Sequence, residues 1–308
     1  MAPTYSVALI QLHPENILPD NTPQPLQPKK NFDKAANFIA SAAQRGAHLA
    51  VLPEYHLTNW EPDHPDFIGS CASWETYLRL YQDLARKHKI CIVPGTILET
   101  IKDENTEEDQ LCNIAYFIDD KGKILGRYQK KNLWHPERPH LTSSTTDHHT
   151  TIQTPLGPIG LLICWDLAFP EAFRELIATG AKIIIIPTFW THTDCSAYGL
   201  SKNPMAEKLF LESTLTTRAF ENTCAAVFVN AGAASGADNE KGYAGLSRVT
   251  LPFVGAMGDE TKDTYEEGMS VVHVDMELVA EAEKHYKVRE DIGGDEWHYT
   301  YRHQGGES

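Results

Sequence analysis

The amino-acid sequence predicts an α/β fold, because strand-like apolar runs alternate with helical patterns along a chain of 308 residues. Each run is short enough to be a buried strand, and the patterns between runs repeat apolar residues at helical spacing. The predicted strands cover residues 6–12, 47–52, 90–93, 113–118, 159–163, 182–186, 225–229, 248–251 and 270–274. The predicted helices cover residues 31–44, 74–87, 171–178 and 206–220. We therefore expect helices that cover the faces of a sheet.

Local signals support these elements. Residues 113–118 and 124–128 flank a short Asp-Asp-Lys-Gly connection, which predicts a hairpin and hence a mixed sheet. Residues 159–163 are apolar and β-branched at both ends, as expected of a strand buried on both faces. The helix that follows places apolar side chains on one face, and Gly180 ends it.

Interruptions between these elements are few. Residues 14–30 carry five prolines and predict an irregular surface segment, whereas residues 102–110 form a charged loop and residues 231–242 a small, polar, glycine-rich one. From about residue 289 the chain is polar, and we expect this tail to be frayed or held by a partner subunit. No segment resembles a linker and no repeat occurs. Residues 1–308 are therefore predicted to form a single domain.

Charge and cysteine content restrict the class of protein. The chain has 27 basic and 42 acidic residues, a net charge of −15, which argues against nucleic acid or an anionic membrane as partner. No apolar run is long enough to cross a membrane, and the amino-terminal residues show no secretion signal. The six cysteines form no C-x-x-C pair, which favours reduced thiols in a cytoplasmic protein.

One of these cysteines, Cys164, directly follows the apolar run 159–163 and precedes the predicted helix 171–178. Backbone N–H groups near the amino end of a helix favour a thiolate and can hold an oxyanion. Cys164 is therefore a candidate nucleophile. Its surroundings alone fit a small buried hydrophobic residue equally well, because that is the usual role of a free cysteine.

Two further segments follow predicted strands. Glu54 comes directly after residues 47–52, and ligands of open α/β sheets gather at the carboxyl ends of strands. Residues 126–141 contain Lys130, Lys131 and Glu137 among aromatic and histidine rings, with little helical or strand periodicity. Aromatic loops of this kind often line sites. A solvated glutamate and a basic surface turn are the simpler interpretations of the two segments when each is taken alone.

Together the three segments resemble the nitrilase superfamily of carbon–nitrogen hydrolases. The resemblance rests on LAVLPEY around Glu54, on Tyr-x-Lys followed by leucine at residues 128–133, and on Cys-Trp-Asp-Leu with Phe-Pro-Glu at residues 164–171. Arg174 and the Gly-Ala and proline pattern at residues 180–187 extend the resemblance. It implies a four-layer α-β-β-α sandwich. It also implies Glu54 as general base, Lys130 rather than Lys131 as electrostatic stabiliser and Cys164 as nucleophile, with Glu137 positioning the lysine and substrate.

The resemblance implies a thiol-dependent amidase that hydrolyses a small linear amide or N-carbamoyl compound through a cysteine thioester and releases ammonia. Conversion of a nitrile by the same residues is the alternative, and a scaffold that has lost its chemistry is a third possibility. Family members usually form dimers or larger homo-oligomers. Motif adjacency predicts an aromatic-lined, mostly uncharged substrate pocket, formed by Tyr55, His56, Trp134, His135, Trp165, Thr188, Phe189 and Trp190.

The position two residues after the cysteine is Asp166, where true nitrilases typically carry glutamate. Leu167 and Ala168 are apolar where relatives that act on D-carbamoyl amino acids carry arginines, which argues against an acidic substrate there.

Other hydrolase classes fit the sequence less well. The pair His148-His149 and the run His192-Thr193-Asp194-Cys195 supply metal-ligating side chains, but no second half with metal-site spacing accompanies them. No G-x-S-x-G motif of a serine hydrolase occurs. The expected chemistry uses neither a metal nor an organic cofactor.

Overall fold

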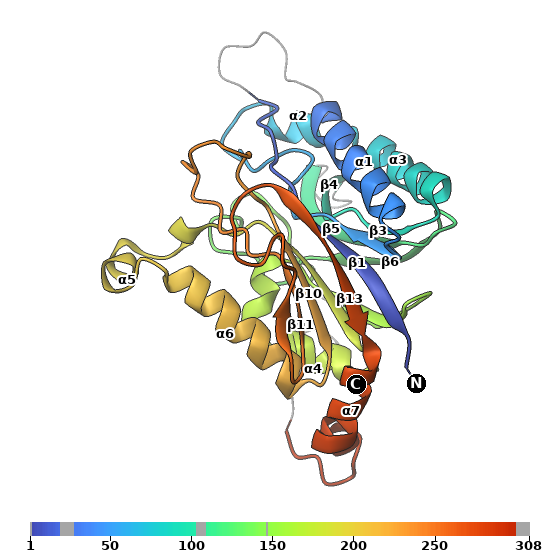
Figure 1. Cartoon of the computed structure of the whole chain (residues 1–308). Helices are drawn as coiled ribbons and strands as arrows, with labels where there is room; N and C mark the ends of the chain where they lie inside the picture. Colours follow the sequence, from blue (N-terminus) through green and yellow to red (C-terminus); the bar gives the residue numbers. More distant parts are fainter. Residues whose placement is uncertain (1, 19–27, 103–108, 146, 300–308) are drawn as a thin grey trace.

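The computed structural model describes residues 2–18, 28–102, 109–145 and 147–299, and shows two packed β-sheets between layers of helices (Figure 1). The first sheet has the order β13-β1-β2-β3-β5-β4, with β6 paired to β5. The second has the order β12-β11-β10-β9-β8-β7. Strands β1 to β3 run parallel to one another, as do β8 to β10.

The strands of the first sheet are β1 (Thr4–Gln11), β2 (Leu49–Val51), β3 (Cys91–Val93), β4 (Thr96–Lys102), β5 (Asp109–Ile118), β6 (Ile124–Gln129) and β13 (Gly268–Asp275). Those of the second are β7 (Ile152–Thr154), β8 (Gly157–Leu161), β9 (Ile183–Thr188), β10 (Ala225–Asn230), β11 (Arg248–Leu251) and β12 (Gly255–Met257). The α-helices are α1 (Lys29–Gln44), α2 (Phe67–Cys71), α3 (Trp74–His88), α4 (Pro170–Ala178), α5 (Ala197–Lys202), α6 (Ala206–Glu221), α7 (Met276–Tyr286) and α8 (Val288–Ile292). The 3₁₀ turns are η1 (Cys164–Ala168) and η2 (His192–Asp194).

The alternation of side chains along the strands explains the layers. In β1, Val7 and Leu9 belong to the core between the sheets, whereas Ala8 and Ile10 pack in the core under α1 and α3. Successive residues of a strand point to opposite faces, so an entirely apolar strand supplies two cores at once. Helices α4 and α6 cover the second sheet (Figure 1). The layering of helix, sheet, sheet and helix that the resemblance implies is confirmed.

Helix α4 lies very close to β8 because of a glycine. A Cβ atom built on Gly160 would come within 2.6 Å of the Leu176 side chain, so any larger residue would force that leucine to move. The expected apolar face of α4 is buried, with Phe173, Leu176 and Ile177 in the core. Strand β8 thus has a fixed position against the helix, and the turn that carries Cys164 leaves the end of that strand.

The structure corrects several expected boundaries. Of the charged loop expected at residues 102–110, Lys102 ends β4 and Asp109 and Gln110 begin β5, whereas residues 103–108 lie outside the described residues. The sequence did not predict the helices α2, α5, α7 and α8 or the strands β4, β7 and β12. The hairpin of β5 and β6 is confirmed by their antiparallel pairing. Most of the proline-rich segment 14–30, at residues 19–27, also lies outside the described residues.

The expected polar tail begins inside α8. The Arg289 guanidinium donates hydrogen bonds to the backbone carbonyls of Ile177 and Ala181, at 3.2 and 2.7 Å. These contacts attach the start of the tail to its own chain, beside the end of α4, and residues 300–308 lie outside the described residues. Within the described ranges every helix is too short or too polar to cross a bilayer. The single domain stays a prediction.

Candidate active site

The three expected catalytic residues lie just beyond the carboxyl ends of strands from both sheets. Glu54 follows β2 and Lys130 follows β6 in the first sheet, and Cys164 follows β8 in the second. The backbone N–H of Glu54 donates to the Thr188 carbonyl at the end of β9, 3.3 Å away. The N–H of Phe189 donates back to Glu54 Oε2 at 3.0 Å. Glu54 is therefore held by the second sheet although it belongs to the first.

A glycine permits the turn that carries Glu54. Gly95 has φ +58°, a left-handed conformation, and a Cβ atom there would lie 1.9 Å from the Pro53 carbonyl oxygen. Any side chain at this position would push the Pro53–Glu54 peptide away. The path of the chain after β3 thus fixes the location of the glutamate.

Lys130 lies between two carboxylates. Its Nζ atom is 2.9 Å from Glu54 Oε1 and 2.7 Å from Glu137 Oε1, and all three side chains are buried. Burial alone would lower the pKa of Lys130, but the carboxylates of Glu137 and Glu54 outweigh burial and hold the pKa well above its usual range. Lys130 is therefore a permanent cation.

Glu137 has a full set of partners. Its Oε1 also accepts a hydrogen bond from the Tyr55 hydroxyl at 2.5 Å, and its Oε2 accepts one from the Trp134 N–H at 2.8 Å. The loop 126–141 thus folds back so that its own glutamate holds its own lysine. The structure places Glu137 against Lys130, and its role as the second glutamate stays a prediction.

The Glu54 carboxylate is suited to exchanging protons. Burial raises its pKa, the Lys130 charge opposes the rise and the Glu137 charge adds to it, and the result is a pKa of about 7. Asn113 Nδ2 donates to Glu54 Oε1 at 2.7 Å and to the Tyr55 hydroxyl at 3.0 Å. A group with a pKa near neutrality can both accept and return a proton at physiological pH.

Cys164 is a neutral thiol in this arrangement, which corrects the expectation of a thiolate favoured by a helix end. A 3₁₀ turn, η1, separates Cys164 from α4, which begins only at Pro170. Burial and the Glu54 charge raise the pKa of Cys164 well above its usual range, although Lys130 opposes them. The thiol donates a long hydrogen bond to the Phe189 carbonyl, 3.8 Å from Sγ. To serve as a nucleophile, the thiol would first have to lose its proton to a base.

The turn at Cys164 adopts an uncommon conformation. Cys164 has φ +47°, which is rare for a residue with a side chain. The fully buried Asp166 carboxylate braces the turn, because its Oδ2 accepts hydrogen bonds from the Ile163 N–H at 2.9 Å and the Tyr128 hydroxyl at 2.8 Å. Its Oδ1 accepts two from Asn132, at 3.0 and 2.8 Å. Asp166 thereby connects the cysteine turn to the segment that carries Lys130.

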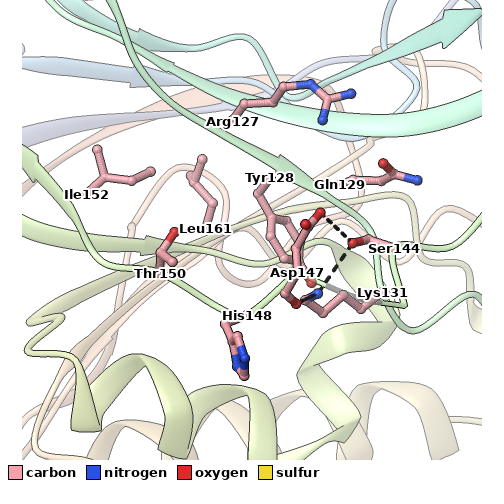
Figure 2. Close-up of a pocket in the computed structure, with 10 residues that line it drawn as sticks. All are labelled: Arg127, Tyr128, Gln129, Lys131, Ser144, Asp147, His148, Thr150, Ile152 and Leu161. Atoms are coloured by element: carbon pink, nitrogen blue, oxygen red, sulfur yellow. Dashed lines mark hydrogen bonds between the residues drawn. The ribbon is translucent and has the colours of Figure 1, made fainter. Parts of the chain in front are cut away.

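Lys131, the neighbour of Lys130, points elsewhere. It lines a separate cavity of about 470 Å³ together with residues of the segment 144–150, where it hydrogen-bonds to Ser144 Oγ and to the Asp147 carbonyl (Figure 2). Adjacent residues at a strand end face opposite ways. The structure thus brings Lys130, and not Lys131, to the two glutamates, in agreement with the register of the motif.

A cavity of about 180 Å³ opens at Cys164. Five of the residues expected to bind substrate line it, namely Tyr55, Trp134, Trp165, Phe189 and Trp190. Trp60, Pro136 and Asp194 also line it and were not expected, because they lie in irregular segments without a pattern. The cavity is smaller than the roughly 300 Å³ at which pockets for drug-sized ligands begin. It therefore suits a small substrate.

Three expected pocket residues lie elsewhere. Thr188 is fully buried in β9, and its hydroxyl donates to the Ile186 carbonyl. His56 is fully buried between the Pro53 carbonyl and the Tyr81 hydroxyl, and burial lowers its pKa to about 3. His135 is exposed beside Trp134. The prediction that these three residues line the pocket was wrong, because it rested on their closeness to the motifs in the sequence. Alternate side chains along a strand or turn point away from the cavity.

Sequence reasoning also missed the roles of Asn113 and Asp166. Both are fully buried polar side chains, and neither follows an apolar periodicity. Asp166 belongs to the cysteine motif, and its position in that motif is the one signal that points to it. Among the residues that the structure describes, no group of three or more His, Cys, Asp or Glu side chains is arranged to hold a metal ion.

Comparison with known proteins agrees with this geometry. Residues 6–284 match the carbon-nitrogen hydrolase family. The chain is a member of this family. It is 26% identical over 274 residues to the 2-oxoglutaramate amidase of Bacillus subtilis, which covers 87% of this chain and 93% of that protein. It is 30% identical over 223 residues to the deaminated glutathione amidase of Bos taurus, across 69% of this chain and 62% of the relative.

The fold of this carbon–nitrogen hydrolase is shared with solved structures. The crystal structure of a carbon-nitrogen hydrolase from Helicobacter pylori superposes with a TM-score of 0.77 at 19% identity, and covers 94% of each chain. The Glu-Lys-Cys triad is a standard feature of the nitrilase superfamily, to which the resemblance in sequence pointed. The protein is thus an enzyme of the carbon–nitrogen hydrolase class whose characterised relatives include amidases.

Proposed function

We propose that this carbon–nitrogen hydrolase is an amidase that cleaves a small linear amide or N-carbamoyl compound and releases ammonia. The observation that carries the proposal is the buried cluster in which Lys130 contacts both Glu54 and Glu137 beside the Cys164 thiol. The names of the amidase relatives support the reaction class. The small, largely aromatic cavity supports a compact substrate.

The proposed reaction begins with proton transfer. Glu54 takes the thiol proton as Cys164 Sγ attacks the carbonyl carbon, because the thiolate and not the thiol is the nucleophile. The oxyanion that forms is stabilised by the Lys130 ammonium and by the backbone N–H of Trp165. Loss of one such donor in other enzymes costs about 100- to 1000-fold in rate. Protonated Glu54 then gives its proton to the departing nitrogen, which leaves as ammonia.

The second half of the reaction releases the acid. The acyl group remains on Sγ as a thioester, and Glu54 removes a proton from a water molecule that attacks it. Collapse of the second tetrahedral intermediate returns the proton to the cysteine and frees a carboxylic or carbamic acid. A pKa of about 7 allows Glu54 to act as base and acid in turn.

The experiment offers a panel of amides, ureides and nitriles, measures ammonia, and searches for an acyl mass on Cys164. Ammonia from amides or ureides, an adduct on Cys164 and loss of turnover in Cys164→Ala are expected. The Cys224→Ala variant is the matched control, because Cys224 is a fully buried thiol outside the cavity. Ammonia from nitriles alone would replace the amidase by a nitrile hydrolase. Activity that survives Cys164→Ala would reject the mechanism.

The proposal extends to assembly and setting. We expect a homodimer or larger homo-oligomer, because Tyr198 on α5 and Leu209 on α6 expose 74% and 60% of their surface. Sedimentation at micromolar concentration tests this, and a monomer would contradict it. A reducing, cytoplasmic setting is proposed because all six cysteines are free thiols. Localisation of the tagged protein in its own cells checks the compartment.

A further inference from the structure

The wall of the substrate cavity contains a carboxylate that the proposed reaction does not use. Asp194 ends the turn η2, which follows β9, and its half-buried side chain lines the cavity that holds Cys164. Its Oδ2 atom accepts a hydrogen bond from the Thr191 N–H at 2.8 Å. Among the described residues, no lysine, arginine or histidine forms an ion pair with it. Burial and the Glu137 charge raise the pKa of Asp194, while the Thr191 hydrogen bonds and the more distant Lys130 charge oppose the rise. The carboxylate therefore faces the cavity without a direct ion pair among the described residues.

The charge of the whole site has the same sign. The residues that line the cavity include two acids, Glu137 and Asp194, and no Lys, Arg or His. Lys130, which contacts the lining residue Glu137, is itself shared between Glu54 and Glu137. An anionic group on a substrate would thus enter a cavity that offers it no cation, whereas a positive group would find an unpaired carboxylate.

A third acid strengthens the negative potential at the same end of the cavity. Glu207 Oε2 accepts a hydrogen bond from Trp190 Nε1 at 2.7 Å, which places Glu207 behind a tryptophan of the cavity wall. Burial raises the pKa of Glu207, and the nearby Asp194 charge adds to the rise. The carboxylates of Asp194 and Glu207 are therefore close enough to repel each other. A cation bound in the cavity beside Asp194 would relieve this repulsion.

The aromatic lining suits the same kind of group. The rings of Trp134 and Trp165 lie with centroids 4.4 Å apart, and those of Trp165 and Trp190 lie 5.5 Å apart. The three tryptophans thus form a continuous wall. Tryptophan faces attract ammonium and guanidinium groups through the ring quadrupole, and the attraction grows when the cation is desolvated. A carboxylate beside aromatic faces is a set of groups that fits an organic cation.

We propose that Asp194 selects substrates in which a short chain joins the amide or carbamoyl group to an ammonium or guanidinium group. The reacting carbonyl lies at Cys164 and the cation at Asp194, with the connecting methylene groups along the tryptophans. This inference rests on the proposed amidase function and names its substrate class. It assigns to Asp194 a role in specificity, and leaves the bond-breaking steps to Glu54, Lys130 and Cys164.

The test compares three amides of equal length that differ at the far end. They are 5-aminopentanamide, which is a cation, hexanamide, which is neutral and carries a methyl group in place of the ammonium, and glutaric acid monoamide, which is an anion. The native enzyme is expected to have its highest kcat/KM with the cationic amide and its lowest with the anionic one. Hydrogen bonds to charged groups support an advantage of about 10- to 100-fold for the cationic over the neutral amide.

Substitutions of Asp194 distinguish a role of its charge in substrate selection from a role of its side chain in holding the turn η2. In Asp194→Asn an amide oxygen can still accept the Thr191 N–H, so the turn keeps its hydrogen bond while the charge is lost. We expect the ratio of kcat/KM for the cationic over the neutral amide to fall about 10- to 100-fold. Asp194→Glu, which keeps the charge, is expected to keep the ratio above that of Asp194→Asn. Asp83→Asn removes an exposed carboxylate from α3 and is the control that should leave the ratio unchanged.

The outcomes distinguish this inference from the amidase proposal. If the neutral amide is hydrolysed through Cys164 and the ratio is the same in the native enzyme and in Asp194→Asn, the role of Asp194 is rejected while the amidase stands. A preference for the anionic amide would also reject it. If neither these three amides nor any other amide or ureide of the panel releases ammonia, the amidase proposal fails, and the selection proposed for Asp194 fails with it.

Discussion

The Nζ atom of Lys130 lies 2.7 Å from Oε1 of Glu137, so the buried lysine is held by a residue only seven positions further along its own loop. Lys130 makes its other ion pair with Glu54, at 2.9 Å. One buried ammonium therefore faces two buried carboxylates, and the cluster as a whole attracts a proton. Burial is the main reason that the pKa of Glu54 rises to about 7, and the Glu137 charge adds to this rise while the Lys130 charge opposes it.

The first prediction concerns Glu137→Gln. The Glu137 charge raises the pKa of Glu54, so its removal should lower that pKa and move the acid limb of the kcat/KM profile to lower pH. Because Gln also loosens the hold on Lys130, kcat is expected to fall about 10- to 100-fold. Ammonia release measured from pH 5 to 9 checks both effects. An acid limb at the native position would show that the two glutamates are not coupled.

The second prediction is the pH dependence of the native enzyme. Glu54 must be ionised to accept the thiol proton, so kcat/KM should decline tenfold per unit below about pH 7. A pH profile of kcat/KM with any turned-over amide measures this limb. If kcat/KM does not change between pH 5 and 7, Glu54 does not act as the base.

The raised pKa of Glu54 also affects stability. A carboxyl group with a pKa of 4.5 when unfolded and about 7 when folded stabilises the native state fully below pH 4.5, and this contribution is lost as pH rises through 7. Urea unfolding of the native enzyme should show this decline, and Glu54→Gln should show less of it. Equal pH dependence in both would contradict the assignment.

The third prediction compares two adjacent lysines. Lys130→Met leaves Glu54 and Glu137 buried without their cation, which should destabilise the protein by about 3–5 kcal/mol and abolish activity. Lys131→Met removes hydrogen bonds at a half-buried position and should cost about 1 kcal/mol. Urea denaturation measures both. The double variant Lys130→Met/Glu137→Gln should regain part of the lost stability, and no regain would show that charge imbalance is not the cause.

The fourth prediction concerns Asp166. Asp166→Asn turns an amide NH₂ toward the N–H and hydroxyl donors that now bond to the carboxylate, so stability should fall by about 2–4 kcal/mol. Activity should fall as well, because the turn at Cys164 loses its brace. Tyr128→Phe removes only one of these bonds and should cost about 1 kcal/mol. Thermal unfolding and turnover check the order of the two variants. A larger loss in Tyr128→Phe would contradict this account.

The fifth prediction uses two glycines with positive φ. Alanine at Gly95 would collide with the Pro53 carbonyl, whereas alanine at Gly157 meets nothing within 4 Å. Both variants carry the conformational cost of about 1–2 kcal/mol for a left-handed residue. Only Gly95→Ala should also lower kcat, because it displaces Glu54. Matching kcat values in the two variants would show that the turn adapts without moving the base.

Strands could be predicted from the sequence where a run of apolar residues indicates burial on both faces of a sheet. Strand β9 consists of four consecutive isoleucines, a proline and a threonine, all buried, and no other element accommodates such a run in a chain of this polarity. Strand β4 escaped prediction because it carries Glu99 at a buried position. That carboxylate accepts hydrogen bonds from Tyr116 and Arg127, which come from β5 and β6. A polar residue satisfied by distant partners looks like a loop residue until the partners are known.

The candidate site also has features that the sequence could predict and features that it could not. Glu54, Lys130 and Cys164 each follow a predicted strand, and their order matches a family motif, so their positions could be predicted. The protonation state of Cys164 could not, because the local sequence shows a turn but not the burial and the Glu54 charge that raise its pKa. Asp194 lines the cavity from a turn without periodicity. Its contact with the site arises only from the way in which the second sheet packs.

The hydrogen bond from the Phe189 N–H to Glu54 joins the two sheets, and it has a consequence for folding. Glu54, the proposed base, belongs to the first sheet, while Cys164, the proposed nucleophile, and this N–H belong to the second. Neither sheet alone contains a working set of groups, so an intermediate with only one sheet formed has no activity. Recovery of turnover during refolding therefore reports the docking of the two halves of the sandwich, and follows the appearance of secondary structure.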